Sequence, residues 1–164
     1  MRNRRRNAVL NMINVLIIYH TQSGNTEKLA RAVAQGVNDT ENAYATFKNA
    51  SNATAQDVRG CNAFVICSPE YFGYMAGAIK DFFDRTYEEL KDDQRIWKKP
   101  YCIVVSAGND GSFAHSHIER ICKGYRFKKI QHPIICKGPV TEEMVRKCFD
   151  LGMTIAEGIN AKIF

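Results

Sequence analysis

The strongest constraint on the fold is an alternation of short apolar runs and amphipathic helical patterns along the whole chain. Residues 13–19, 63–67 and 101–106 form nearly unbroken apolar runs of strand length. Such runs are expected for strands that are buried on both faces of a parallel sheet. Weaker strand patterns lie over 43–48 and within 130–136. Five strands that alternate with helices, joined by right-handed crossovers, predict an α/β fold with a doubly wound parallel sheet.

The helices between these strands are recognised by apolar residues at helical spacing. We expect helices over 26–37, 75–90 and 112–123 and a last helix after Thr141, with Ser112 and Thr141 as N-cap residues. The polar stretches are predicted as loops, the first of them with a short helical turn: 49–60, 68–74 and 107–111.

Length and charge favour one soluble domain over 12–164. Four arginines within the first six residues carry most of the net charge of +6, and residues 1–11 contain no acid. We therefore predict a basic, disordered extension over 1–11, or an upstream start of the reading frame. The rest of the chain is nearly neutral, so we expect no nucleic-acid partner. Asn11 and Asn14 interrupt the first apolar stretch, which is too short to cross a membrane, so we expect no membrane partner.

The six cysteines form no C-x-x-C pair and no close Cys/His spacing suited to zinc. Several of them lie inside apolar runs, where a thiol behaves as a small buried apolar group. This pattern is typical of a reducing cytoplasm, which is the location we predict. The cysteines are Cys61, Cys67, Cys102, Cys122, Cys136 and Cys148.

Histidines and basic residues leave two questions open. His115 and His117 lie two positions apart on one helix, so they point to different faces and predict no metal pair. His20 borders the first polar loop and is either a structural histidine or a ligand contact. A basic cluster is either a solvated rim or a docking patch for an acidic partner or a nicotinamide nucleotide phosphate. It comprises Arg120, Lys123, Arg126, Lys128 and Lys129.

The loop after the first strand has the composition of a phosphate site. In open α/β sheets ligands bind beyond the carboxyl ends of the strands, and backbone N–H groups at a helix N-terminus bind phosphate. Gly24 allows a tight turn there. The loop lacks the lysine of nucleoside-triphosphate loops and the three glycines of dinucleotide loops, so we predict a phosphate monoester. The candidate residues are Thr21, Gln22, Ser23, Gly24, Asn25 and Thr26.

Two further loops follow strand ends. Three aromatic residues within four positions after the third strand are costly to expose, which indicates a platform for a flat ring or packing against the next helix. Two glycines after the fourth strand would let backbone N–H groups approach the edge of a ligand. The candidates are Pro69, Glu70, Tyr71, Phe72, Gly73 and Tyr74 in one loop, and Ser106, Ala107, Gly108, Asn109, Asp110 and Gly111 in the other.

Two of these segments resemble known families. Residues 21–26 resemble the phosphate loop of flavodoxins, a threonine- and serine-rich turn that ends in Gly-Asn-Thr. Residues 68–86 resemble the corresponding part of flavodoxin-like NAD(P)H:quinone oxidoreductases of the WrbA type and of related NADPH-dependent FMN reductases. The two segments occur in the right order, about 45 residues apart. This resemblance implies a flavodoxin-like fold with strand order 2-1-3-4-5 over residues 12–162.

The resemblance also implies FMN as a non-covalent cofactor and no metal. Residues 21–26 would hold its phosphate, residues 69–74 would line the isoalloxazine ring and ribityl chain, and residues 106–111 would approach the pyrimidine edge. An acid near the ring, Glu70 or Asp110, would oppose negative charge there and lower the reduction potential.

The sequence leaves two functions open. One is an oxidoreductase that takes electrons from NAD(P)H and reduces a small acceptor through FMN. The other is a flavodoxin-type one-electron carrier between redox partner proteins. The chain is too short for the inserted segment that helps WrbA-type enzymes form tetramers, so we expect a monomer or a homodimer. Flavin-free signalling and phosphatase domains are disfavoured, because Tyr19 and His20 replace the aspartate of a receiver domain and the first loop has no cysteine.

Overall fold

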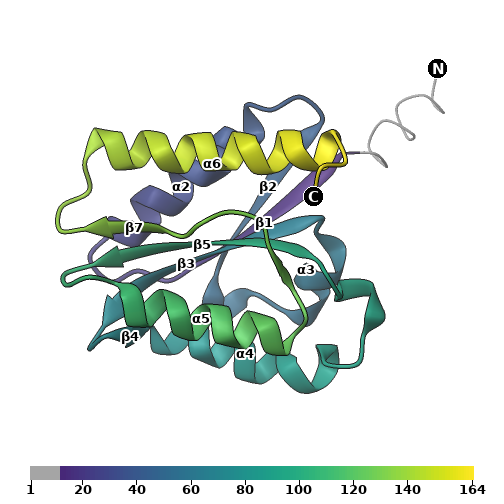
Figure 1. Ribbon diagram of the computed structural model, residues 1–164, viewed down its shortest axis with the longest axis horizontal. Coiled ribbons are helices and arrows are strands. Elements are labelled where there is room, and N and C mark those ends of the chain that lie inside the picture. Colours follow the sequence, from purple (N-terminus) through teal and green to yellow (C-terminus); the bar gives the residue numbers. More distant parts are fainter. Residues whose placement is uncertain (1–11) are drawn as a thin grey trace.

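The computed structural model describes residues 12–164, and the extension predicted for 1–11 lies outside this part. The core of the fold is a parallel sheet in the order β2-β1-β3-β5, extended beyond β5 by β6 and β7 (Figure 1). β4 is a short strand that pairs antiparallel with the end of β3. The predicted strand order is therefore confirmed, with β6 and β7 sharing the fifth position. The strands are β1 (Ile13–Tyr19), β2 (Ala43–Asn49), β3 (Ala63–Tyr71), β4 (Tyr74–Met75), β5 (Pro100–Ala107), β6 (Lys128–Lys129) and β7 (Ile134–Lys137).

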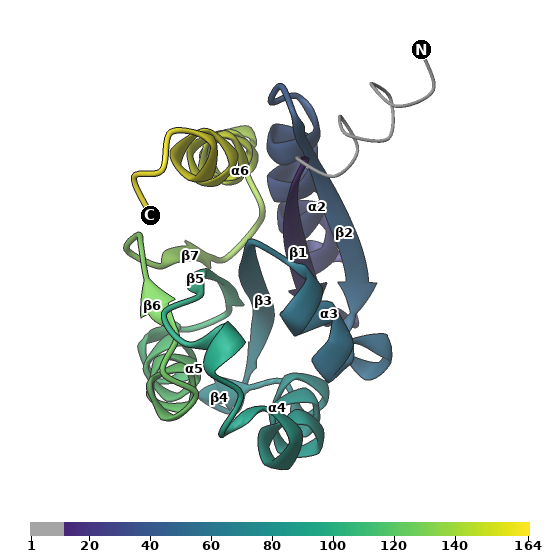
Figure 2. The same cartoon turned by 90° about the vertical axis from the view of Figure 1, so that its right-hand side faces the viewer.

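Helices cover both faces of this sheet (Figures 1 and 2). One face carries α2 (Asn25–Asn38) and α6 (Glu142–Asn160). The other face carries α3 (Ala55–Gly60), α4 (Gly77–Leu90) and α5 (Ser112–Gly124). Two single 3₁₀ turns, η1 (Ala50–Asn52) and η2 (Gln94–Ile96), complete the connections on that side.

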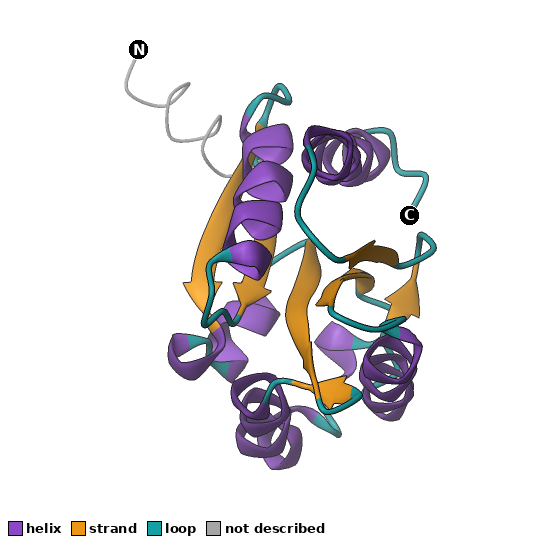
Figure 3. Cartoon of the chain, turned by 90° about the vertical axis from the view of Figure 1, so that its left-hand side faces the viewer, coloured by secondary structure: helices purple, strands orange, loops and turns teal. Residues whose placement is uncertain are grey.

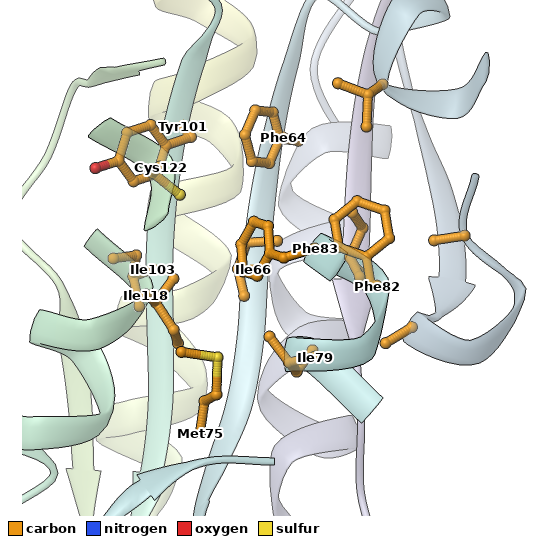
Figure 4. Packing of buried hydrophobic residues seen from close by; sticks show 14 of the residues in the cluster. Phe64, Ile66, Met75, Ile79, Phe82, Phe83, Tyr101, Ile103, Ile118 and Cys122 are labelled. Atoms are coloured by element: carbon orange, nitrogen blue, oxygen red, sulfur yellow. The ribbon is translucent and has the colours of Figure 1, made fainter. Parts of the chain in front are cut away.

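Strand side chains alternate between two cores. In β1, Leu16 and Ile18 face the core under α3, α4 and α5, whereas Val15 and Ile17 face the core under α2 and α6. This alternation follows from the two-residue period of a strand. Because helices cover both faces of the sheet, both sets of side chains are apolar, which explains the unbroken apolar runs in the sequence. Figure 4 shows the larger core, where Phe64 and Ile66 of β3 meet side chains of α4 and α5.

Helices α2 and α6 approach each other through two glycines. A Cβ atom added at Gly36 would lie 2.0 Å from the Phe149 carbonyl oxygen, and one at Gly152 would lie 2.0 Å from the Val33 carbonyl oxygen. Only glycine permits such an approach of two helix backbones. The helix that follows the first loop is therefore fixed firmly against α6.

Three boundary predictions were wrong. Residues 68–74 are not a loop, because β3 continues to Tyr71 and a two-residue turn leads into β4. The following helix begins at Gly77 rather than Met75, since Met75 pairs with Glu70. Ser112 is the first residue of α5 and not its N-cap, which is Gly111. The fifth strand predicted within 130–136 is present as β7, which begins at Ile134 and is preceded by the two-residue β6.

The N-cap of the last helix and the burial of the cysteines were predicted correctly. Thr141 caps α6, its hydroxyl accepting a hydrogen bond from the Met144 N–H. All six cysteines are buried and free, and burial raises the pKa of the Cys61 thiol to about 11. Within residues 12–164, no helix has both the length and the apolar character that crossing a bilayer requires.

Candidate functional site

The carboxyl edge of the sheet forms a cleft of about 680 Å³. Figure 3 views the molecule from this side, where the loops that leave β1, β3, β5 and β7 come together. This volume is typical of small-molecule and cofactor sites. The cleft is lined by Ser23, Asn25, Lys28, Pro69, Glu70, Tyr71, Ser106, Ala107, Gly108, Gly138, Pro139 and Val140.

The first loop is shaped around Gly24, the N-cap residue of α2. Gly24 has φ +94°, a left-handed conformation that glycine adopts readily. Its N–H donates to the Thr21 hydroxyl oxygen at 3.0 Å, and its carbonyl accepts the first helical bond from Lys28. The turn is therefore held by its own residues before any ligand arrives.

The N-terminus of α2 offers unpartnered donors. Within the described residues no side chain caps this helix, so the backbone N–H groups of Asn25, Thr26 and Glu27 have no acceptor. The Glu27 carboxylate does not compensate, because it bonds the Arg31 guanidinium at 2.6 and 2.9 Å. Lys28 adds a positive charge to the cleft wall. Free amides, a helix dipole and a lysine together favour an anion at this point.

Thr26 plays a different part from its neighbours. Its side chain is buried, and its hydroxyl lies 2.7 Å from the hydroxyl of Ser106 at the end of β5. This buried hydrogen bond joins the first loop to the third and fixes the spacing between two walls of the cleft.

The second loop is a hairpin with a two-residue turn. Tyr71 pairs with Tyr74 across it, and the two central residues, Phe72 and Gly73, have φ +52° and +74°. Positive φ at both positions defines a type I′ turn, which favours Asn-Gly. A phenylalanine there is a conformational outlier, and its side chain is fully exposed.

Ser68 anchors the base of this hairpin. Its buried hydroxyl accepts a hydrogen bond from the Ala76 N–H at 3.0 Å and donates to the Pro69 carbonyl at 2.8 Å. Behind the hairpin, the ring of His20 meets the ring of Tyr71 edge-on, with centroids 6.1 Å apart. Burial raises the pKa of the Tyr71 hydroxyl above its usual value.

The two acids expected near a bound ring have different surroundings. Glu70 lines the cleft, and one of its carboxylate oxygens accepts a hydrogen bond from the Asn109 N–H at 3.3 Å. Asp110 is turned toward α5, where it accepts bonds from the N–H and the hydroxyl of Ser112. These bonds lower the pKa of Asp110. Glu70 is thus the acid that faces the cleft.

Two histidine nitrogens near this edge are buried without a partner in the described structure: Nδ1 of His20 and Nδ1 of His115. Buried polar atoms of this kind are rare and call for an explanation such as a bound molecule. His117 differs, because its Nδ1 lies 2.7 Å from the Phe113 carbonyl oxygen. Among residues 12–164, no three His, Cys, Asp or Glu side chains gather as metal ligands would.

The structure brings eight of the predicted site residues onto the cleft wall and places the rest around it. On the wall lie Ser23, Asn25, Pro69, Glu70, Tyr71, Ser106, Ala107 and Gly108. Outside the wall lie Thr21, Gln22, Gly24, Thr26, Phe72, Gly73, Tyr74, Asn109, Asp110 and Gly111.

Sequence reasoning missed a fourth loop and one helical residue. Gly138, Pro139 and Val140 follow β7 and line the cleft, and the Gly138 N–H donates to the Ala107 carbonyl at 2.8 Å. The glycine–proline pair after a strand was a signal that could have indicated this wall. Lys28 lies in the first turn of α2, three positions after Asn25. This spacing puts both residues on one face of the helix and could have indicated Lys28 as a further wall residue.

FMN fits this arrangement of residues. The free N–H groups of α2 and Lys28 suit a phosphate monoester, and the cleft between Tyr71 and residues 106–108 has room for a flat ring. Fold and site therefore define a flavodoxin-like FMN-binding protein.

A comparison with protein families also assigns the chain to an FMN-binding class. Residues 37–132 match the model of the NADPH-dependent FMN reductase family, and the chain belongs to that family. The matched part includes the hairpin and the third loop but starts after the phosphate loop.

Individual relatives extend the similarity to flavodoxins. A flavodoxin from Aquifex aeolicus (strain VF5) is 34% identical over 100 residues, which are 61% of this chain and 53% of the relative. The match thus spans about half of that relative's length.

Solved structures of low identity share the fold. A flavodoxin from the domain Archaea superposes with a TM-score of 0.74 at 19% identity, covering 90% of this chain and 99% of that one. A WrbA-like flavodoxin from Agrobacterium tumefaciens gives 0.76 at 14% identity, with 91% and 98% covered. The Flv1 flavodiiron core from Synechocystis sp. PCC6803 gives 0.78 at 22% identity, and the match covers 98% of this chain but 41% of that one.

Proposed function

We propose that this protein is an NAD(P)H-dependent oxidoreductase that reduces a small acceptor through bound FMN. Bound FMN supplies the redox chemistry, exchanging electrons between a nicotinamide donor and the acceptor. The chain's own residues have three tasks: holding the phosphate, shaping the space around the ring, and leaving one side of the cleft open to a second flat molecule.

In this proposal the phosphate is held by the N–H groups of Asn25, Thr26 and Glu27. The hydroxyl of Ser23 and the ammonium of Lys28 face the same cleft. Thr21 and Thr26 position this loop rather than lining the cleft, since the first accepts from Gly24 and the second contacts Ser106.

The ring region would be bounded by Pro69, Glu70 and Tyr71 on one side and by Ser106, Ala107 and Gly108 on the other. Tyr71 presents a half-buried aromatic ring held by His20. A Cβ atom added at Gly108 would meet nothing within 4 Å, so backbone groups of the third loop are accessible there.

The observation that carries the proposal is the tip of the hairpin. Phe72 is fully exposed and has φ +52°, two features that each raise the free energy of the folded chain. Both are explained if a flat donor or acceptor stacks beside the cleft at this tip. The family match supports the same interpretation, because it includes the hairpin.

An anaerobic titration of the FMN-loaded protein tests the proposal. Absorbance is followed first during addition of dithionite and then, with fresh protein, during addition of NADPH. We expect NADPH to bleach the flavin band rapidly, without a new long-wavelength band at half-reduction. Flavin that stays oxidised with excess NADPH, yet is reduced by dithionite, would contradict the proposal.

The second candidate is a one-electron carrier between redox proteins. It is favoured by the similarity to flavodoxins of nearly the same length, one of which is covered to 99%. A persistent long-wavelength band at half-reduction, together with inert NADPH, would favour this function instead.

We place the protein in the cytoplasm, acting as a monomer or homodimer. Six buried free thiols support a reducing compartment. Expression with fluorescent labelling and sedimentation analysis would test the two parts of this placement separately.

A further inference from the structure

A second hollow lies between β4 and helices α4 and α5. It has a volume of about 430 Å³, within the range of small-molecule sites. Figure 2 shows the two helices on the same face of the sheet, with β4 beside them. We call it the α4–α5 groove, and it is lined by Tyr74, Lys80, Tyr87, His117, Arg120, Ile121, Gly124 and Tyr125.

The walls of the groove are aromatic. The Tyr74 ring meets His117 at 4.8 Å between centroids, and the Tyr87 ring meets Tyr125 edge-on at 5.3 Å. Tyr87 is 41% exposed, unusual for a large ring on a helix that packs on the core. Gly124 leaves open space between these walls, since nothing lies within 4 Å of a Cβ placed there. The groove therefore offers faces on which a flat heterocycle can stack.

The charge of the groove is positive. Lys80 and Arg120 line it and no acid does. Lys80 is already paired with Asp84 at 2.6 Å, whereas Arg120 has no carboxylate within ion-pair distance among residues 12–164. Its neighbour Glu119 is engaged by Lys123 and Lys129 at 3.3 and 3.0 Å. Arg120 is thus the cation that remains available to an anion, and arginine suits phosphate particularly well.

The groove and the FMN cleft both reach the hairpin. Tyr71 lines the cleft and Tyr74 lines the groove, and these two residues are directly paired across the hairpin. Helix α5 begins at the third loop of the cleft, and Arg120 lies eight residues further on. At a rise of 1.5 Å per residue this is about 12 Å along the helix, a distance that the two halves of a dinucleotide can span.

From these observations we infer that the α4–α5 groove binds the adenosine 2′-phosphate part of NADPH, with Arg120 selecting NADPH over NADH. The tyrosine walls stack on the adenine, and the guanidinium of Arg120 pairs with the 2′-phosphate. This inference rests on the proposed function, because it names the nucleotide donor of the same site. A concave, largely aromatic hollow with one free cation fits a nucleotide better than the flatter surface of an acidic protein.

Binding of nucleotide fragments to the FMN-loaded protein tests the inference without any turnover. The probes are 2′,5′-ADP and 5′-ADP, followed by isothermal titration calorimetry, with bound FMN keeping them out of the phosphate loop. We expect 2′,5′-ADP to bind at least ten-fold more tightly than 5′-ADP. Arg120→Gln should abolish this difference, and Tyr87→Ala should weaken both probes alike.

Arg146→Gln is the matched control. Arg146 is an arginine of α6 on the opposite face of the sheet, outside the groove, so its removal should leave both affinities unchanged. Equal binding of the two probes, or a loss of the same size in both arginine variants, would overturn the inference and leave an acidic partner protein as the occupant.

The titration described above keeps the two failures apart. If NADPH reduces the flavin while Arg120→Gln changes neither probe, the groove inference is overturned and the proposed function stands. If the probes depend on Arg120 while NADPH leaves the flavin oxidised, nucleotide binding in the groove is supported and the proposed function is overturned.

Discussion

The two edges of the sheet differ in whether their polar groups have hydrogen-bond partners within the chain. At the carboxyl edge, the first N–H groups of α2 and Nδ1 of His20 have no partner among the described residues. At the amino edge, the Lys99 ammonium donates to three backbone carbonyls at 2.6–3.1 Å. Asp93, at the same edge, forms ion pairs with two arginines. The one buried polar atom without a partner at this edge, among the described residues, is Nε1 of Trp97. The comparison indicates that side chains satisfy most polar groups at the amino edge, whereas a ligand would supply the missing partners at the carboxyl edge.

Lys99→Met should produce the largest loss of stability, at the amino edge. It removes the donor from the carbonyls of Val58, Arg59 and Cys61 at the end of α3. Leaving buried acceptors unsatisfied should lower the free energy of unfolding by about 3 kcal/mol, measured by urea denaturation.

FMN affinity should be unchanged in this variant if the two edges are independent. The control is Lys98→Met, which removes the neighbouring ammonium and should change stability little. A Lys99→Met protein that loses FMN affinity as well as stability would show that the two edges are not independent.

Gly24→Ala should come next, at the carboxyl edge. With φ +94° this position disfavours any Cβ, although space is open around it, and the strain should destabilise the fold by about 1–2 kcal/mol. Since the turn orients the N–H groups of α2, we also expect FMN affinity to fall about ten-fold, as measured by fluorescence titration. Gly60→Ala is the control, because Gly60 has open space around it and no positive φ. Equal effects of the two substitutions would show that the left-handed conformation of Gly24 contributes nothing to stability or FMN binding.

Phe72→Asn should raise stability and lower activity. Asparagine suits the left-handed turn position and exposes no large ring, so we expect a gain of about 1 kcal/mol in the free energy of unfolding. NADPH oxidation should slow because the ring at the cleft margin is lost. A variant that is more stable and fully active would show that Phe72 has no role in the reaction.

Glu70→Gln should raise the reduction potential of the bound flavin. Removing a negative charge from the cleft wall favours the state that gains electrons, by about 1 kcal/mol at a partly exposed site. For a two-electron couple this is a rise of about 20 mV, measurable by spectroelectrochemistry. Asp110→Asn is the control, because Asp110 faces Ser112; a larger shift in that variant would reverse our assignment of the acid.

Asp93→Asn should have the smallest effect of these substitutions, a loss of stability that is present at neutral pH and disappears in acid. Hydrogen bonds from Arg95 and Arg59 hold the pKa of Asp93 well below its usual range. A lowered folded-state pKa stabilises the fold above the unfolded value of 3.8, and this stabilisation is lost as the pH falls through the folded value. The wild type should therefore lose stability below about pH 4, and a variant with the same acid profile would show that other groups cause the loss.

Much of the fold was predictable because buried strands leave a strong pattern. The runs at 13–19 and 101–106 agree with β1 and β5 to within a residue or two, since both strands are covered on both faces. The prediction failed at residues 68–74, where polar and aromatic residues suggested a loop. Cross-strand pairing of Glu70 and Tyr71 with Met75 and Tyr74 decides the structure there, and a single sequence does not show such pairing.

The site was predictable in part for a related reason. The sequence shows where strands end, and three residues predicted near those ends, Ser23, Glu70 and Ser106, line the cleft. The bond between Thr26 and Ser106, 80 residues apart, and the groove beside Arg120 depend on how distant elements meet. These features follow from packing and have no local signature in the sequence.

The most direct test of the central claim compares the affinities of the apoprotein for FMN and for riboflavin, which lacks the phosphate. If the free N–H groups of α2 hold the phosphate, FMN should bind at least about 100-fold more tightly, since charge-assisted hydrogen bonds contribute roughly 1.5–3 kcal/mol each. Flavin fluorescence quenching gives both dissociation constants in one experiment. Equal affinities, or no binding of FMN, would contradict the account of this edge of the sheet.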